Sequence, residues 1–135
     1  MSRYGGGSGR GNVLTFQLRV TQFNGQQTLK DKAHALKPDC QVQAFAVGRY
    51  HKLERPVLRF TEKENVFILL ALVDLSADNG LIQFPSKAVK TDAEPDMVEY
   101  IPICLSAGDA LVWKGGLVNL VPKGGGGLFA RIRLG

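Results

Sequence analysis

Apolar and polar residues alternate along two stretches at opposite ends of the chain. Between residues 13 and 22, the sequence VLTFQLRVTQ has an apolar side chain at every second position. Successive side chains of a strand point to opposite faces, so this pattern predicts a strand with one buried face. The segment 128–134 alternates as well. It has Leu128, Ala130, Ile132 and Leu134 on one face and Phe129, Arg131 and Arg133 on the other.

Seven further short apolar segments lie between these two, separated by turn residues. We predict strands at 41–50, 56–62, 66–73, 81–84, 100–105, 110–113 and 117–121. Residues 66–73 include no polar side chain, which predicts a strand with both faces buried or with one face against another subunit. A buried helix is the alternative, although eight residues is short for one. Asp78-Asn79-Gly80 predicts a hairpin turn into 81–84. The polar stretch before Pro38 predicts at most one short helical turn.

This series of short strands determines the expected fold class. About eight antiparallel strands without a long helix predict an all-β fold, a jelly-roll or double-stranded β-helix sandwich. At 135 residues, the chain has the length of one domain, which we expect to span residues 13–135. Residues 1–12 are rich in Gly and Ser and cannot pack a core, so we expect a flexible Gly/Arg-rich arm.

Positive charge is concentrated towards the start of the chain. Residues 1–60 contain ten Lys and Arg against three Asp and Glu, whereas residues 61–135 contain seven against nine. This asymmetry indicates contact with a polyanion, and a solubilising surface charge is the alternative. The candidate residues for contact with RNA, DNA or a neighbouring subunit are Arg3, Tyr4 and Arg10 in the arm, and Arg49, Lys52, Arg55 and Arg59 in a basic patch, for which a solvated face is the alternative.

Hydropathy and cysteine content limit the expected location. No apolar run reaches the length of a bilayer span, and the N-terminus lacks the apolar core of a signal peptide. Cys40 and Cys104 are too few for a disulfide framework and predict two buried thiols. We therefore expect no membrane partner, no secretion through a signal peptide, and a cytoplasmic or virion location.

Residues suited to catalysis are scarce. His34 and His51 are the only histidines, which excludes a three-histidine metal site. His51 with Glu54 is better interpreted as a surface pair than as a metal site, and Cys40 with His51 lacks any local signature of a nucleophile and its base. We therefore expect no catalytic residue, no metal and no cofactor, and hence no enzyme.

Two aromatic residues and one glycine run have structural interpretations. Trp113 and Tyr100 lie in apolar strand patterns, which favours core or interface packing over a ligand platform. The glycines at 124–127 are interpreted as a flexible loop between the last two strands. The alternative is a close backbone approach by a ligand or a neighbouring subunit.

Two segments in the region 67–131 carry a family resemblance. ILLALVDLSADNGLIQFPSKAVK and LSAGDALVWKGGLVNLVP resemble two strand pairs of phytanoyl-CoA dioxygenase-like double-stranded β-helix proteins. That family uses iron and 2-oxoglutarate, bound by an HxD pair, a distal His and an Arg. The resemblance places His51 near the first ligand, Leu53 at the acidic ligand, Asn119 at the distal His and Arg131 at the co-substrate Arg. It therefore implies a non-catalytic oxygenase-like subunit that partners an active homologue.

The overall layout carries a second resemblance. A Gly/Arg arm, a short all-β body and a strand at the C-terminus are similar to small viral jelly-roll coat or virion-associated proteins. In such proteins the arm binds nucleic-acid phosphate or contacts neighbouring subunits. The main functional hypothesis is therefore a non-enzymatic structural protein of a capsid or virion that self-associates. The oxygenase-like subunit is the alternative.

Overall fold

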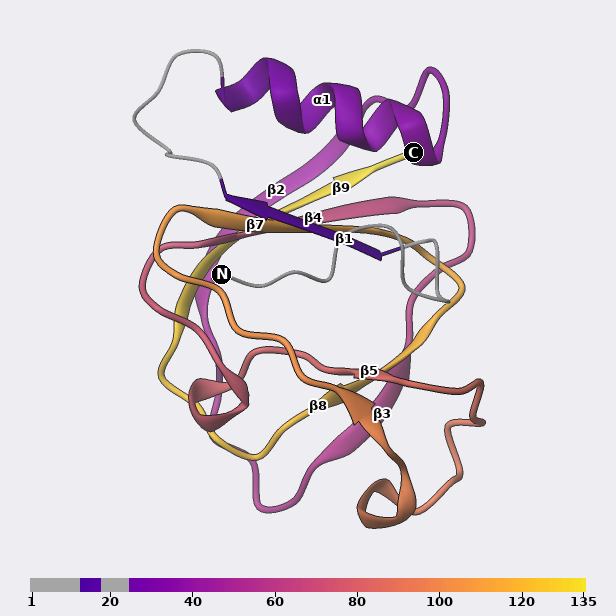
Figure 1. Cartoon of the computed structure of the whole chain (residues 1–135), viewed down its shortest axis with the longest axis vertical. Helices are drawn as coiled ribbons and strands as arrows, with labels where there is room; N and C mark the ends of the chain where they lie inside the picture. Colours follow the sequence, from indigo (N-terminus) through magenta and orange to yellow (C-terminus); the bar gives the residue numbers. More distant parts are fainter. Residues whose placement is uncertain (1–12, 18–24) are drawn as a thin grey trace.

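The described residues form two facing layers of antiparallel strands with one helix on the outside (Figure 1). The computed structural model describes residues 13–17 and 25–135. The first layer is a five-stranded sheet in the order β1-β7-β4-β9-β2. Its strands are β1 (Val13–Gln17), β2 (Val42–Arg49), β4 (Val66–Ala71), β7 (Asp109–Lys114) and β9 (Leu128–Leu134). The predicted all-β sandwich is thus confirmed.

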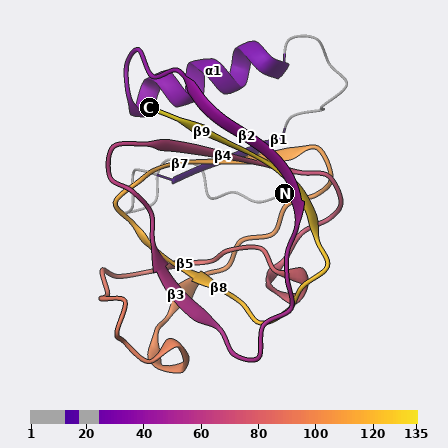
Figure 2. The same cartoon turned by 180° about the vertical axis from the view of Figure 1, so that it is seen from behind.

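The second layer consists of two strand pairs, which lie below the large sheet in Figures 1 and 2. An antiparallel bridge between Gln83 and Leu120 joins the two pairs, so that they face the large sheet together. The pairs are β3 (Val57–Phe60) with β8 (Val118–Val121), and β5 (Phe84–Pro85) with β6 (Tyr100–Ile101). Two short 3-10 turns, η1 (Ala77–Asn79) and η2 (Pro95–Met97), lie in the connections.

Strand β4 lies at the centre of the five-stranded sheet, between β7 and β9. Phe67 and Leu69 belong to the core between the two layers, together with Trp113 of β7. Ile68 points to the other side, into the cluster beneath the helix. Both faces of β4 are therefore buried, as its wholly apolar sequence predicts, whereas Leu72, just after the strand, is 39% exposed.

Helix α1 (Gly25–Leu36) covers the outer face of the large sheet. The prediction of at most one short helical turn is wrong, because this helix has 12 residues. Leu29 and Ala33, four positions apart, are 7% and 0% exposed and pack in the cluster formed with β4 and β7. Packing of this narrow apolar stripe stabilises a helix whose sequence is otherwise polar.

The turn at Asp78-Asn79-Gly80 does not form the predicted hairpin. Ser76 and Asn79 form a capping box around η1, and Gly80 ends it with a φ of 110°. The next strand, β5, pairs with β6 and not with β4. Gly80 therefore adopts the positive φ expected of a turn glycine, but the turn connects the large sheet to the second layer and not two paired strands.

Several other expectations are limited or corrected by the structure. Cys40 is buried but Cys104 is exposed, so the prediction of two buried thiols is wrong for Cys104. Within the described ranges, no helix is long and apolar enough to cross a membrane. Residues 18–22 of the first predicted strand lie outside the described residues, as does the arm at 1–12 with Arg3, Tyr4 and Arg10.

Candidate functional site

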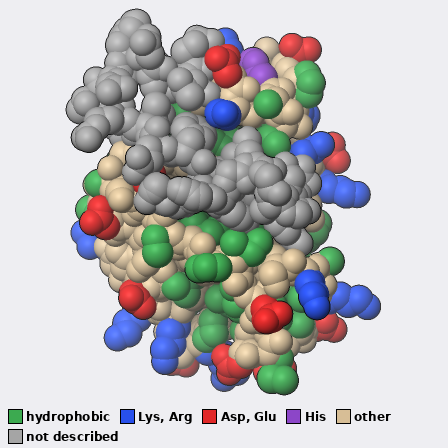
Figure 3. Space-filling view, viewed as in Figure 1, with side chains coloured by type: hydrophobic (Ala, Val, Ile, Leu, Met, Phe, Trp, Pro, Cys, Tyr) green, Lys and Arg blue, Asp and Glu red, His purple; other side chains and the backbone are tan. Residues whose placement is uncertain are grey.

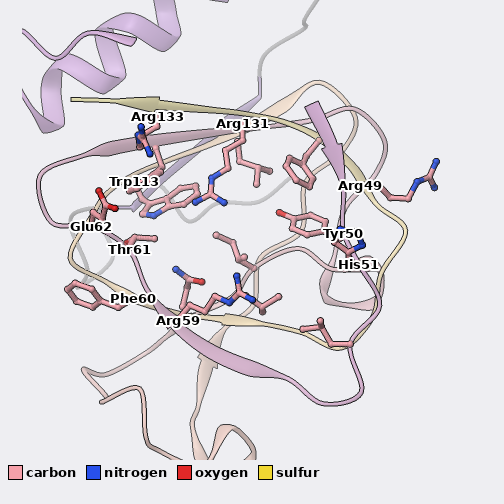
Figure 4. A pocket seen from close by; sticks show the side chains of 17 residues that line it. Arg49, Tyr50, His51, Arg59, Phe60, Thr61, Glu62, Trp113, Arg131 and Arg133 are labelled. Atoms are coloured by element: carbon pink, nitrogen blue, oxygen red, sulfur yellow. The ribbon is translucent and has the colours of Figure 1, made fainter. Parts of the chain in front are cut away.

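A pocket of about 420 Å³ opens between the two layers (Figure 4). Strand β9 contributes Phe129, Arg131 and Arg133, the three side chains that the alternation at 128–134 places on one face. The same strand buries Ala130 and Leu134. The opposite layer supplies the facing wall through β3 and β8, and the segment after β2 supplies Tyr50, His51 and Leu53. The period-two pattern of β9 therefore directs its arginines into the pocket.

The pocket lining carries an excess of positive charge. Four arginines line it, Arg49, Arg59, Arg131 and Arg133, and Glu62 is the one acidic residue in the described lining. The Arg131 guanidinium lies 5.3 Å from the centre of the Phe67 ring. The Arg131 side chain is exposed, yet partial loss of water is the largest cause that lowers its pKa. Tyr50 raises this pKa, whereas the charges of Arg133 and Arg59 lower it further. No carboxylate among the described residues compensates this charge.

Two buried hydrogen-bond donors in the pocket lining have no partner in the described part of the chain. They are the Tyr50 hydroxyl and the Trp113 indole nitrogen, Nε1. Trp113 is fully buried, and the Tyr50 ring packs on Phe129 with ring centroids 4.4 Å apart. Figure 4 shows the Tyr50 hydroxyl directed towards the middle of the pocket. An unsatisfied buried donor costs about 1–3 kcal/mol, so a ligand with acceptor atoms would recover this free energy.

Asn119 adds a polar group on the opposite wall. The residue is 4% exposed and lines the pocket. In the β3–β8 register it lies opposite Arg59, and directly paired residues of antiparallel strands project from the same face of the sheet. The pocket thus combines arginines with the nearly buried Asn119 and with two buried donors, on Tyr50 and Trp113, that have no partner among the described residues.

An iron ion does not fit the residues at this site. Of the three positions that the family resemblance assigns to metal ligands, only His51 carries a suitable donor, and its side chain is exposed. Leu53 has no donor atom, and Asn119 offers a neutral amide in place of an imidazole. Among the residues that the structure describes, no three His, Cys, Asp or Glu converge as a metal-binding group.

The four basic residues of the predicted patch do not share one environment. Arg49 and Arg59 line the pocket, whereas Lys52 and Arg55 are exposed and lie outside its lining. On the face shown in Figure 3, Lys and Arg side chains are interspersed with Asp and Glu. Contact of these residues with nucleic acid or a neighbouring subunit stays a prediction, as it does for the arm residues.

Cys40 and His51 do not form a nucleophile and base. Cys40 lies in the cluster under α1, where its carbonyl oxygen is 3.0 Å from Nε2 of His34. His51 lines the pocket between the layers, on the other side of the large sheet. Burial raises the pKa of the Cys40 thiol, which disfavours the reactive thiolate.

The glycines at 124–127 hold the pocket rim through close backbone contacts. They form the loop between β8 and β9, and the close approach is made by the chain itself. A Cβ on Gly125 would lie 2.5 Å from the backbone nitrogen of Lys52. The Tyr50 amide donates to the Gly127 carbonyl at 2.9 Å, and the Gly126 amide donates to the Tyr50 carbonyl at 2.8 Å. This loop therefore fixes the backbone that carries Tyr50.

Sequence reasoning missed Tyr50 and Trp113 as site residues. Trp113 is in the core as expected, packed 5.4 Å from Phe67 between ring centroids, but its Nε1 is also an unpaired donor at the pocket. No sequence pattern reveals whether a buried donor has a partner. The inward face of β9 was the available signal for Arg131 and Arg133.

Comparison with known proteins identifies the fold alone. No protein-family model and no curated protein matches the chain. Among solved structures, AviO1 from Streptomyces viridochromogenes Tue57 has a TM-score of 0.61 at 19% identity, covering 78% of this chain and 56% of AviO1. SnoN, a non-heme α-ketoglutarate-dependent epimerase from nogalamycin biosynthesis, has a TM-score of 0.60 at 14% identity, covering 79% and 52%. The carbocyclase SnoK from the same biosynthesis has a TM-score of 0.56 at 12% identity, covering 78% and 54%.

These similarities confirm one hypothesis and contradict another. The fold is that of non-heme iron, 2-oxoglutarate-dependent oxygenase-like double-stranded β-helix proteins, as the resemblance of residues 67–131 predicts. The predictions of a non-enzymatic protein and of a viral coat or virion component are wrong, because the similar structures with a stated activity are biosynthetic enzymes. The chain spans about half the length of these proteins.

Proposed function

We propose that this chain is a domain of the 2-oxoglutarate-oxygenase-like class whose pocket binds a small organic acid through Arg131. The observation that supports this proposal is the uncompensated charge of Arg131. Its guanidinium lies among Arg59, Arg133 and the Tyr50 hydroxyl, and no carboxylate of the described residues acts on it. A guanidinium binds a carboxylate through two parallel hydrogen bonds, and charge-assisted bonds of this kind are about twice as strong as neutral ones.

The pocket dimensions and its neutral donors support the same class of ligand. A volume of about 420 Å³ lies in the lower part of the range for small-molecule sites. Phe129 and Phe67 supply apolar surface, and the Tyr50 hydroxyl supplies a further donor for a carboxylate or carbonyl oxygen. Such a lining favours a short carbon chain with acidic ends.

Removal of the Arg131 charge tests the proposal. We expect isothermal titration calorimetry of the wild-type chain with 2-oxoglutarate and succinate to show binding, and Arg131→Met to weaken it at least about tenfold, which is 1.4 kcal/mol. Arg55→Met removes an exposed arginine outside the pocket lining and serves as the matched control. Absence of heat with the wild type, or equal affinity in both variants, contradicts the proposal.

A second candidate function is a subunit that works beside a homologue with a complete metal site. Leu53 and Asn119 at two of the three ligand positions favour it, because iron would then be bound by the other chain. This candidate predicts a stable complex with such a homologue, with a light-scattering mass equal to the sum of the two chains. Two separate species in that measurement would count against it.

A further inference from the structure

Arg59 lies beside Asn119, which the family resemblance places at the position of the distal histidine ligand. It lies directly opposite Asn119 in the β3–β8 register, and both residues line the pocket. Paired residues of this kind have Cβ atoms about 4.5–5.5 Å apart on the same face. The pocket wall formed by β3 and β8 therefore carries the positive charge of Arg59 and the carboxamide of Asn119.

Arg59 and Arg131 enter the pocket from opposite layers. Figure 4 shows Arg131 reaching down from β9 and Arg59 coming from β3. The two groups are near enough for the charge of Arg59 to act on the pKa of Arg131. No carboxylate among the described residues acts on the pKa of Arg131, and the charge of Arg59 faces it from the opposite wall, so the two positive charges repel each other across the pocket.

We propose that the pocket binds a dicarboxylate without a metal ion, with Arg131 holding one carboxylate and Arg59 with Asn119 holding the other. This inference rests on the proposed function and deepens it. A guanidinium is always charged and presents its donors in a planar fork that matches a carboxylate. It therefore supplies positive charge at that wall without needing the histidine and aspartate that a metal requires.

The two-ended arrangement determines ligand preference. A dianion compensates both guanidinium groups, whereas a monoanion leaves one of them uncompensated. The neutral groups are distributed in the same manner, with the Tyr50 hydroxyl beside Arg131 and the nearly buried Asn119 beside Arg59. Both ends of a short dicarboxylate would thus meet a charge and a neutral polar partner.

The experiment compares matched ligands with and without metal. Calorimetry on the full chain uses succinate and glutarate against butyrate, each in the presence of EDTA and again with added Mn²⁺. We expect dicarboxylate affinity to change by less than twofold between these conditions, and to exceed butyrate affinity at least tenfold. Arg59→Met should remove this preference, with less than a threefold effect on butyrate, whereas Arg131→Met should weaken both ligands.

Two controls separate a binding effect from loss of structure. Arg59 is exposed, so the circular dichroism spectrum and melting temperature of Arg59→Met should match the wild type. Arg59→Lys retains the charge but removes the planar fork, and we expect it to recover part of the preference for dicarboxylates.

The outcomes distinguish this inference from the function on which it rests. Binding that EDTA abolishes and Mn²⁺ restores would overturn the metal-free site and leave the organic-acid pocket intact. Equal affinities for succinate and butyrate would overturn the two-ended site alone. A wild-type chain that binds none of these acids would overturn both proposals.

Discussion

Tyr50 combines aromatic packing with an unpaired donor. Its ring packs against Phe129, and its buried hydroxyl has no hydrogen-bond partner in the described part of the chain. Burial is the largest cause that raises the pKa of Tyr50, because the phenolate loses more hydration than the neutral phenol. At neutral pH the residue is thus a neutral donor beside Arg131.

The raised pKa of Tyr50 has a consequence for stability in alkali. Tyrosine in the unfolded chain ionises at about pH 10, whereas Tyr50 in the folded chain holds its proton to higher pH. The contribution of Tyr50 to the free energy of unfolding is therefore fully present below about pH 10, and it is lost as pH rises through the folded-state pKa of Tyr50. We expect Tyr50→Phe to flatten the fall in unfolding free energy between about pH 9.5 and 11, measured by urea denaturation. Parallel curves for wild type and variant would refute this assignment.

At the scale of elements, α1 depends on its contact with the sheet. Ala33 of α1 is fully buried against the sheet, whereas Ala35, on the same helix, is exposed. We expect Ala33→Asp to cost about 3 kcal/mol or more, because it places an unpaired carboxylate against apolar side chains. Ala35→Asp, the matched control, should cost about 1 kcal/mol or less. Urea unfolding measures both, and equal losses would contradict the observed packing.

The longer strands were predictable and the helix was not, for one physical reason. Of the strands predicted at 81–84 and 100–105, only Phe84 and Tyr100–Ile101 belong to strands. Period-two alternation over 128–134 and the wholly apolar run at 66–73 are local signals of strand burial. The apolar stripe of α1 is narrow, and its stability comes from the sheet beneath it. The site was predictable in part. Resemblance indicated Arg131, but the pairing of Arg59 with Asn119 depends on a register between segments about sixty positions apart.

For the whole molecule, β2 forms one border of the five-stranded sheet. Among the described residues it pairs only with β9. Its residues 42–48 carry no charge, and Val42, Phe45 and Val47 are 63%, 63% and 62% exposed. Edge strands usually carry Lys or Pro, which block pairing with another chain. A second copy could pair antiparallel along this edge without placing like charges opposite each other.

We therefore predict that this chain self-associates through β2. We expect light scattering at micromolar concentration to show a mass above one copy, and Phe45→Lys to shift it towards a single copy. Met97→Lys changes an exposed apolar residue of η2, away from β2, and should leave the mass unchanged. A single-copy mass for the wild type would exclude this interface.

The glycine loop at 124–127 limits which substitutions the chain can accept near the pocket. Neighbouring backbone occupies the space that side chains on Gly124 and Gly125 would need. Positions of this kind accept almost no replacement, although none of them belongs to the pocket lining. Retention of these glycines, more than of any single arginine, would therefore mark the relatives in which the rim around Tyr50 keeps its shape.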